Sequence, residues 1–548
     1  MALDSTVLFI GDQPQFFFDD AVVEVADHLT RTIHRPVPDE RSPLISRDRP
    51  WEHVTYFSCN SWNLRRDADS GRFHCFYTDF KMDRERLWSR GGGSHGWENA
   101  RLRQLYARSE DGIDWVKPPM GIQHEDGHDT NIVFGTEDYG SVYDIFIVDD
   151  PLERDPRRRF KTLYTRIVPV DENESRFTVH AAYSADGIHL TPSDEGPVFG
   201  RLGRERGDVT IMAFDPDSQT HIAATRHPFY RSVPGRGHLR PPAPGRPGVG
   251  GEPGFDAALG SATRQGRRRI FLIESRDFLR WSEPRPILVP DPALDNLDDA
   301  FYGMTPLRLG GQWVGFLNVF HMVSNTMDVQ LVHSRDGRAW HRVAPGRPWL
   351  QRGEPGSWNE FMVTVPSPPV AMGDELWVYH GGSKNHHDWW FAGGNEAADN
   401  PEAWRDVPEV WDWDAVGYGL GLARLRRDGF VSLGANPVRE GVLVTQPLLS
   451  WGNTLAVNAA CRGHGFLRAE ILDEAGAVIP GYAAGECEPF RGDAVEHVLR
   501  WNGRAELRGR AGAGAGAGEA DAPRFRRIRF LLRDGELYSF RLRGGAGS

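Results

Sequence analysis

The chain lacks several features that would place it in other classes of protein. Only 4 of its 548 residues are cysteine, and no two of them form a C-x-x-C pair. This spacing argues against a zinc site and against a disulfide scaffold. No run of about 18 apolar residues occurs, so we expect no membrane span. The first residues have no basic stretch and an early Asp4, unlike a signal peptide, so we expect a cytoplasmic protein.

An excess of positive charge is also missing. Lys and Arg number 64 against 76 Asp and Glu, so the formal net charge is −12. Binding to a phosphate backbone needs a basic face, and we therefore expect no nucleic-acid partner. Long helical periodicity is hard to find, whereas short β-branched and aromatic runs bounded by Gly, Pro, Asn and Asp are frequent, as at residues 73–77, 270–273 and 313–317. These runs predict an all-β chain.

One short motif occurs four times. The copies are SEDGIDW, SADGIHL, SRDFLRW and SRDGRAW, at residues 109–115, 184–190, 275–281 and 334–340. Ser and Asp fold their side chains back onto the backbone, Gly supplies a positive φ, and Trp returns to the core beyond the turn. A hairpin that returns every 60 to 90 residues, roughly, is typical of a repeat architecture, and radially repeated antiparallel sheets form a β-propeller with its ligand site at the axis.

The length and the later strands divide the chain into two expected domains, because 548 residues exceed one ordinary core. A fifth blade is indicated by the alternating segment 418–430, which ends in Arg427-Asp428-Gly429. We therefore predict a five-bladed β-propeller over residues 1–440. Residues 441–548 resemble a meander of short strands and are predicted to form a C-terminal β-sandwich.

The third copy of the motif resembles the S-x-D-(L/F)-x-x-W turn of the five-bladed glycoside hydrolases of families 32, 43, 62, 68 and 130, and the other copies are similar to its D-G variant. A propeller followed by a β-sandwich is the domain order of family 32. The W-M-N-D-P-N-G, R-D-P and E-C-P motifs are not found, and Glu486-Cys487 falls in the expected sandwich. The resemblance therefore implies an outlying member of this clan and leaves the substrate open.

The resemblance also implies that acids on the innermost strands of successive blades converge at the axis. Glycoside hydrolysis needs two carboxyl groups, one protonated and donating to the leaving oxygen, the other ionised as nucleophile or base. Asp12 is an alternative to Glu52 in the first blade, and Asp129 precedes Asp144 in the second. The predicted catalytic acids are Glu52, Asp144, Asp208, Asp299 and Glu360.

Each of these acids also has a structural interpretation. Asp at a strand start is commonly a turn residue or an Asx cap. Asp208, Asp299 and Glu360 are favoured because each precedes an apolar strand without the Gly that marks a plain turn. The acids of the four repeated turns are predicted to be structural; they are Asp111, Asp186, Asp277 and Asp336.

Segment 380–390 holds three His, a Lys, an Asn, an Asp and two Trp, which suits a loop that contacts sugar; a plain surface loop and a metal site are the alternatives. The adjacent His386 and His387 would point apart on a strand and do not make a natural ligand pair, so no metal site is predicted. We expect no cofactor, with a structural calcium at the axis, as in some family 43 members, as the alternative. The predicted substrate-binding residues are His321, Trp358, His380, Lys384, His386 and His387.

These observations predict a glycoside hydrolase that cleaves a terminal, furanosidic sugar from a glycoside or oligosaccharide. One alternative is a phosphorylase similar to family 130, in which Arg166, Arg226 with His227, and Lys384 would bind phosphate. Another is a carbohydrate-binding propeller without catalysis. A sialidase fits less well, because its turn is one residue longer. The C-terminal domain would either brace the propeller or build a dimer contact, which leaves a homo-oligomer open.

Overall fold

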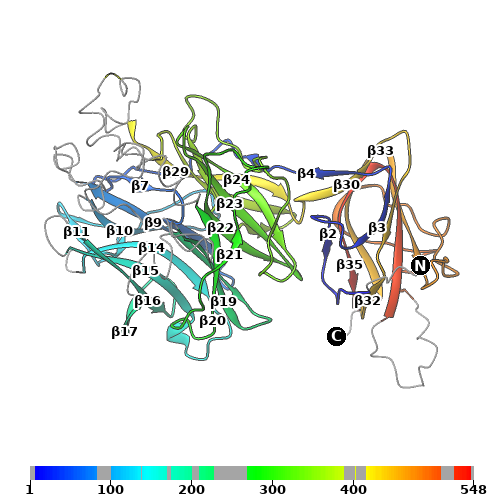
Figure 1. The fold of residues 1–548 in the computed structure, drawn as a ribbon, viewed down its shortest axis with the longest axis horizontal. Coiled ribbons are helices and arrows are strands. Elements are labelled where there is room, and N and C mark those ends of the chain that lie inside the picture. Colours follow the sequence, from blue (N-terminus) through cyan, green and yellow to red (C-terminus); the bar gives the residue numbers. More distant parts are fainter. Residues whose placement is uncertain are drawn as a thin grey trace.

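The computed structural model describes residues 7–82, 100–136, 139–169, 175–199, 209–227, 268–387, 402, 415–507 and 524–544. Apart from the 3-10 helix η1 (Pro156–Arg158), the regular elements of these residues are strands, which confirms the all-β prediction. Within the same residues no helix has the length and apolarity that a membrane crossing requires. The strands gather into two bodies, a larger one built of blades and a smaller one that contains the C-terminal strands (Figure 1).

Each blade is an antiparallel run of strands from an inner strand at the axis to an outer strand, and one parallel pair, Met327↔Met362, links the fourth and fifth blades into a single sheet. The first blade contains β7 (Thr55–Tyr56), β8 (Trp62–Arg66), β9 (Phe73–Met82), β10 (Ala100–Ser109) and β13 (Ile132–Phe134). The second contains β14 (Ser141–Asp149), β15 (Phe160–Pro169), β16 (Ser175–Ser184) and β17 (Thr191–Phe199). The third contains β18 (Val209–Asp215), β19 (Thr220–His227), β20 (Arg269–Ser275) and β21 (Arg285–Leu288).

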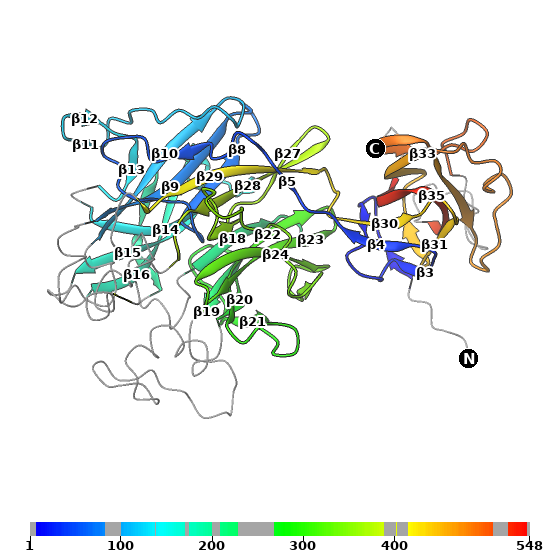
Figure 2. The same ribbon diagram turned by 90° about the horizontal axis from the view of Figure 1, so that it is seen from above.

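The fourth blade contains β22 (Asp299–Leu309), β23 (Gln312–His321), β24 (Thr326–Ser334) and β25 (His341–Arg342). The fifth contains β26 (Met362–Thr364), β27 (Val370–Met372), β28 (Glu375–Ser383), β29 (Tyr418–Arg426), β5 (Val37–Pro38) and β6 (Ile45–Ser46). A small hairpin of β11 (His124–Glu125) and β12 (His128–Asp129) lies outside the blades. The inner strands β8, β14, β18 and β22 contact one another in sequence order, as the inner strands of a propeller do (Figure 2). The five-bladed propeller prediction is thereby confirmed.

The outer strand of the fifth blade comes from the N-terminal part of the chain. β5 and β6 pair antiparallel with β29, in the registers Ala423↔Pro38 and Leu420↔Ile45. The Asp39 carboxylate adds an ion pair with Arg424 on the same strand. The N-terminal segment that leads into the first blade is therefore hydrogen-bonded into the last blade, which closes the ring.

Apolar side chains fill the spaces between successive blades. Phe146 and Leu163 of the second blade share a core with Ile211 and Ile273 of the third. A separate cluster joins the third blade to Phe301 of the fourth. Trp340, from the fourth copy of the motif, is buried in that cluster, whereas the Trp115 and Trp281 side chains are only half-buried against theirs.

The second body is a sheet of ten strands in the described residues. The long strands β33 (Thr454–Leu472) and β35 (Arg524–Arg543) run through it, and their register shifts between Cys461 and Phe466. Its other strands are β1 (Leu8–Phe9), β2 (Gln15–Phe16), β3 (Val23–Asp27), β4 (Thr30–Ile33), β30 (Val431–Ala435), β31 (Gly441–Thr445), β32 (Leu448–Ser450) and β34 (Gly492–Val498), beside β33 (Thr454–Leu472) and β35 (Arg524–Arg543). Its interpretation as a β-sandwich stays a prediction. So does the division at residue 440, although the pairing places residues 8–33 in this sheet rather than in a blade.

The four copies of the motif make the same turn. In the fourth copy, the Ser334 hydroxyl accepts a hydrogen bond from Gly337 N–H at 2.9 Å, and the Asp336 carboxylate accepts from Arg338 and Ala339 N–H at 2.7 Å each. The equivalent bonds occur in the copies at Asp111, Asp186 and Asp277. The predicted structural role of these acids is confirmed.

The third copy shows why glycine occupies this turn in the others. Gly112, Gly187 and Gly337 have φ of +79°, +70° and +72°, and Phe278 has to adopt +66° at the same position. A non-glycine residue in this region costs about 1–2 kcal/mol. The Phe278 ring is fully buried, and burial of a phenylalanine contributes about 1.5–3 kcal/mol, which offsets the strain.

We expect Asp336→Ala to lower the free energy of unfolding by about 1–3 kcal/mol, because two backbone N–H groups lose their acceptor. The measurement is urea unfolding followed by tryptophan fluorescence. Asp194→Ala, which changes an exposed acid on β17, is the control and should stay within about 0.5 kcal/mol of the parent. Equal stability of the two variants would contradict the role given to the turn.

Candidate active site

The direction of the strands distinguishes the two ends of the propeller. Successive strands of a blade run antiparallel, so the inner strand begins at the same end at which the second strand connects to the third. We call this end the loop face. The four repeated turns connect the third strand to the fourth and therefore lie at the opposite end.

Four buried tyrosines from four blades form a layer at the axis: Tyr56 on β7, Tyr143 on β14, Tyr302 on β22 and Tyr418 on β29. The Tyr56 and Tyr418 rings meet edge-on, with 4.9 Å between their centroids. Burial, together with Cys59 and the other three tyrosines, raises the pKa of Tyr56 well above its ordinary value. The Tyr56 hydroxyl therefore stays protonated at neutral pH and is a hydrogen-bond donor.

Asp144 lies beside this layer on the inner strand of the second blade, as the sequence predicts. It is fully buried, its φ is +74°, and the register between β14 and β15 shifts between Tyr143 and Phe146. Bulges of this kind redirect a side chain and are frequent next to active sites, and the left-handed backbone stores strain. Burial and the Asp144 charge raise the pKa of Tyr143 well above its ordinary value, so a protonated phenol stands next to this carboxyl group.

Asp299 begins the inner strand of the fourth blade and is bound in a charged triad. The His321 ring donates to Asp299 Oδ1 from Nδ1 at 2.6 Å and to Asp328 Oδ2 from Nε2 at 2.9 Å. Burial alone would lower the pKa of His321, but the two carboxylates outweigh it and raise that pKa to about 10. Burial would raise the pKa of Asp299, but the bond to His321 holds it below its ordinary value. Asp299 is thus an ionised carboxylate whose partner is a fixed imidazolium.

The remaining predicted acids have local partners or lie elsewhere. Both oxygens of Glu52 are engaged, since Tyr77 donates to Oε1 at 2.8 Å and Lys117 donates to Oε2 at 2.8 Å. Glu360 is half-buried and caps its own turn by accepting from Gly356 N–H at 2.7 Å. These contacts favour structural roles for Glu52 and Glu360. Asp208 lies outside the described residues.

Two acids that the sequence offered as alternatives are placed away from the axis. Asp12 lies between β1 and β2 of the ten-stranded sheet, so its assignment to the first blade is wrong. The reason is that the opening strands pair with β32 and β35 rather than with the blades. Asp129 lies in the small β11–β12 hairpin, where it accepts from Gly121 N–H.

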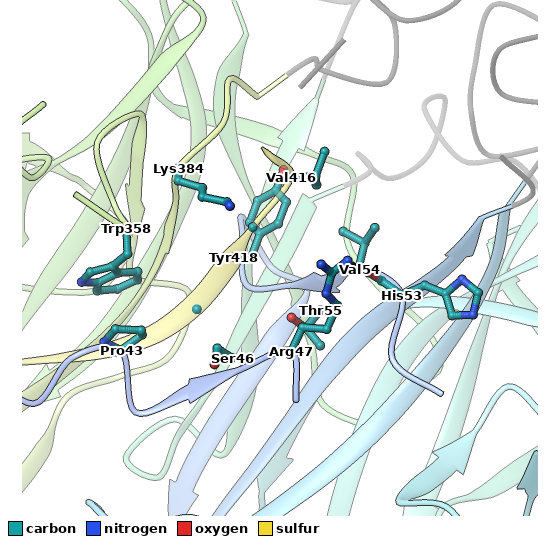
Figure 3. A pocket seen from close by; sticks show the side chains of 12 residues that line it. Pro43, Ser46, Arg47, His53, Val54, Thr55, Trp358, Lys384, Val416 and Tyr418 are labelled. Atoms are coloured by element: carbon teal, nitrogen blue, oxygen red, sulfur yellow. Dashed lines mark hydrogen bonds between the residues drawn. The ribbon is translucent and has the colours of Figure 1, made fainter. Parts of the chain in front are cut away.

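A cavity of about 220 Å³ opens on the loop face between the fifth and first blades (Figure 3). Lys384 extends over it toward Tyr418, while the Trp358 indole and Pro43 stand together at its other end. Its lining residues come from two parts of the chain, residues 43–55 and residues 358–419: Pro43, Ser46, Arg47, His53, Val54, Thr55, Trp358, Lys384, Val416, Gly417, Tyr418 and Gly419. Two of the predicted substrate-binding residues, Trp358 and Lys384, are among them.

Glycines on two neighbouring strands leave the space that the Trp358 indole occupies. A Cβ at Gly382 would stand 2.5 Å from the indole, and a Cβ at Gly421 would stand 2.6 Å from it. The His380 ring stacks on the indole at 5.5 Å, and burial lowers the pKa of His380 to about 4, so this ring is neutral. Gly417 leaves room in the same way for the Lys384 stem, which a Cβ would approach to 2.6 Å. Gly382 and Gly421 therefore form a floor under the Trp358 indole, and Gly417, just before β29, leaves the space for Lys384.

The predicted histidines take different places. His380 lies beneath Trp358, and His321 belongs to the Asp299 triad. His387 is buried, and its Nε2 lies 2.6 Å from the Tyr302 hydroxyl. His386 packs against the Phe361 ring at 4.1 Å. His387 is thus the histidine of segment 380–390 that touches the tyrosine layer.

Two arginines contact the same layer. The Arg226 guanidinium lies 3.8 Å from the Tyr302 ring centroid, and that of Arg268 lies 4.9 Å from it. Arg226 is a phosphate-binding candidate from the sequence. Arg166, another such candidate, packs on Tyr139 at 4.8 Å, and the His227 side chain lies outside the described residues.

Sequence reasoning missed several of these residues. The tyrosines and Arg47 carry no motif, and Arg268 follows a segment without strand signals. The one available signal was the alternation of glycine in Gly417-Tyr-Gly-Leu-Gly421, which marks a close approach of other groups to a strand. Among the described residues, no three His, Cys, Asp or Glu side chains are grouped as metal ligands would be.

No protein-family model matches the chain, and no curated protein matches it. Solved structures do. A β-1,2-mannobiose phosphorylase from Listeria innocua is 12% identical, with 71% of this chain and 96% of that chain covered and a TM-score of 0.42. A GH32 β-fructofuranosidase of Bombyx mori is 13% identical, with 92% and 95% covered and a TM-score of 0.36. An N-acetylgalactosamine deacetylase from F. plautii is 12% identical, with 72% and 95% covered and a TM-score of 0.40.

The triad predicts a pH dependence of stability. The pKa of His321 in the folded protein, about 10, exceeds its ordinary value of 6.5, so its contribution is complete below about pH 6.5 and is lost as the pH rises through 10. We expect the melting temperature of the parent to exceed that of His321→Gln at pH 6.5, and this difference to shrink steadily toward pH 10.5. Exposed His464→Gln is the control and should follow the parent throughout. A constant gap between parent and His321→Gln would contradict the triad.

Proposed function

We propose that this protein is a carbohydrate-active enzyme, a glycoside hydrolase that removes a terminal sugar at the loop face. The observation that carries the proposal is Asp144. It is a fully buried carboxyl group on an inner strand, at a bulge, with a left-handed backbone, beside a layer of protonated tyrosines. This position distinguishes Asp144 from the acids of the repeated turns, which accept hydrogen bonds from backbone N–H groups at the opposite end of the propeller.

Hydrolysis of a glycoside requires one carboxyl group as proton donor and a second as nucleophile or base. In our proposal Asp144 is one of the two. Asp208, which directly precedes β18 in the sequence, is the candidate for the other. The tyrosine hydroxyls would donate hydrogen bonds to sugar oxygens, and the furanosidic nature of the sugar is carried over from the sequence as part of the proposal.

Asp299 has a different role in this proposal. Its ion pair with His321 keeps it ionised, so it is no proton donor. Both of its oxygens are engaged, because Oδ1 is bonded to His321 and Oδ2 accepts a hydrogen bond from Asn296 N–H at 3.0 Å, and a carboxylate held in this way is poorly placed to attack a sugar carbon. We infer that Asp299 is a positioning residue, which holds the start of β22 and thereby the Tyr302 three residues further along the strand.

We expect Asp144→Asn to reduce turnover of the cognate glycoside at least about 10³-fold, because the amide can neither transfer the proton nor stabilise developing charge. The measurement is hydrolysis across a panel of aryl furanosides and pyranosides. Asp149→Asn is the matched control, since Asp149 is the last residue of the same strand, at the far end, and is bonded to Arg159 on the surface. Full activity of Asp144→Asn on a substrate that the parent cleaves would refute the assignment.

A phosphorylase is the second candidate, and one observation favours it. Arg226 and Arg268 both lie over the Tyr302 ring, so two guanidinium groups stand next to the axial layer, and such groups bind phosphate well. In that reaction phosphate, rather than water, would accept the glycosyl group.

If the phosphorylase proposal is right, turnover should require inorganic phosphate and yield a sugar 1-phosphate. Arg226→Gln should then raise the apparent KM for phosphate about 10-fold or more, since a charge-assisted pair is lost. Product analysis by mass spectrometry, with and without phosphate, separates the two reactions. Turnover that proceeds equally well without phosphate would remove the phosphorylase.

A further inference from the structure

A second cavity lies where the two bodies of the protein meet. Its volume is about 360 Å³, and one side of it is built by β4 and the residues after it, which lead from the ten-stranded sheet into the propeller (Figure 1). The other side belongs to the fourth blade and the segment that follows it. We call it the junction cavity. Its lining residues are Arg31, Thr32, Ile33, Arg35, Leu331, Ala344, Arg347, Pro348 and Trp349.

The junction cavity is separate from the loop face. Leu331 lies three residues before Ser334, at which the fourth repeated turn begins, and the repeated turns lie at the end of the propeller opposite the loop face. Among the described residues, the junction cavity and the cavity of Figure 3 share no lining residue. A molecule bound in the junction cavity would therefore be distinct from a glycoside at the axis.

One side of the junction cavity is apolar and firmly held. Trp349 and Leu331 are buried in the core that the two bodies share, and Ile33 packs against that core. Trp349 Nε1 donates to the backbone oxygen of His34 at 2.7 Å, and the indole packs on Phe430 with 5.8 Å between the ring centroids. His34 and Phe430 flank the paired strands β4 and β30. The apolar side is therefore a fixed surface against which the organic part of a ligand can pack.

The charged side of the cavity is formed by arginines, one of which is matched by acids of the same region. Arg31 forms an ion pair with Asp20 and also donates to the backbone oxygen of Asp19 at 3.2 Å. The Asp19 carboxylate is itself bonded to Arg335 at 2.6 Å. The charges of these two acids are thus accounted for by Arg31 and Arg335.

Arg35 and Arg347 are the remaining cations, and they come from the two different sides of the cavity. Both are exposed, and neither side chain has an ion pair or a hydrogen bond within the described residues. No Asp or Glu is among the nine lining residues in this part of the chain. The cavity therefore presents two guanidinium charges that its own lining does not balance.

These two charges match a phosphate group better than a carboxylate. A phosphate group carries about −1.5 to −2 at neutral pH and offers three strong acceptor oxygens, so two guanidinium forks can bind it together. A carboxylate has a single charge and two oxygens. The volume of about 360 Å³ lies within the range of roughly 300–1,000 Å³ that small-molecule sites have, which leaves room for an organic part as well.

We propose that the junction cavity binds the phosphate group of a small molecule, a sugar phosphate or the free ion. The phosphate lies between the Arg35 and Arg347 guanidinium groups, and the sugar of a sugar phosphate packs against the apolar side that Trp349 and Ile33 form. Such a ligand contacts both bodies of the protein at once. The proposal does not depend on the proposed function, and its test does not use turnover.

The test is isothermal titration of the full-length protein in a phosphate-free buffer. Glucose 6-phosphate is compared with glucuronate and glucose, which present a carboxylate or no charge on the same ring, and inorganic phosphate is titrated separately. We expect glucose 6-phosphate to bind at least about 10-fold more tightly than glucuronate or glucose. The affinity of inorganic phosphate relative to glucose 6-phosphate then shows whether the organic part contributes.

Variants locate the binding. Arg35→Gln and Arg347→Gln should each weaken the binding of glucose 6-phosphate about 10-fold or more, because a charge-assisted pair is lost. Both side chains are exposed, so each variant should keep the melting temperature of the ligand-free parent. Arg276→Gln changes an exposed arginine in the third repeated turn and is the matched control, which should bind as the parent does.

Three results would overturn the proposal. One is binding of glucose 6-phosphate no tighter than that of glucuronate or glucose. Another is an unchanged affinity in both Arg35→Gln and Arg347→Gln, either of which is sufficient if the other does not fold. The third is a loss of affinity in Arg226→Gln alone, which would place the phosphate at the axis. Equal binding of inorganic phosphate and glucose 6-phosphate through Arg35 and Arg347 would support the site and identify the free ion as its ligand.

Discussion

The pairing of β5 and β6 with β29 is the constraint on which the rest of the structure depends. A propeller is stable only as a closed ring, because an open last blade would expose unpaired backbone groups along its edge. Here the closing strands come from residues 37–46, so a short N-terminal segment fixes the last blade to the first. The same pairing creates the cavity, since it brings Pro43 and Arg47 against Trp358 and Lys384. The cavity therefore exists only in the closed ring, and a substitution that disrupts the closing strands would also disrupt the cavity.

The segment before the closing strands ties the two bodies together. β1 to β4 pair within the ten-stranded sheet, and the chain then enters the propeller at β5. The chain leaves the propeller after β29 and returns at once to the same sheet through β30, which pairs with β4. Two adjacent crossings, joined by backbone hydrogen bonds, restrain the bodies more than one linker would. Apolar side chains of both, such as Phe316 and Leu455, also share one core.

The sequence was sufficient to predict the propeller but only part of the site. The repeated turn predicted the blades because its hydrogen bonds are local, made by Ser and Asp to N–H groups within four residues. The contacts within the tyrosine layer at the axis are long-range, because Tyr56 and Tyr418 are distant in the chain and meet only when the ring is closed. Asp299 illustrates the difference. Its position on an inner strand was predicted from the sequence, but no sequence feature pointed to Asp328, the second carboxylate bonded to His321. The assignment of Asp12 to the first blade was wrong for the same reason, because no local feature of the sequence indicates which sheet a two-residue strand joins.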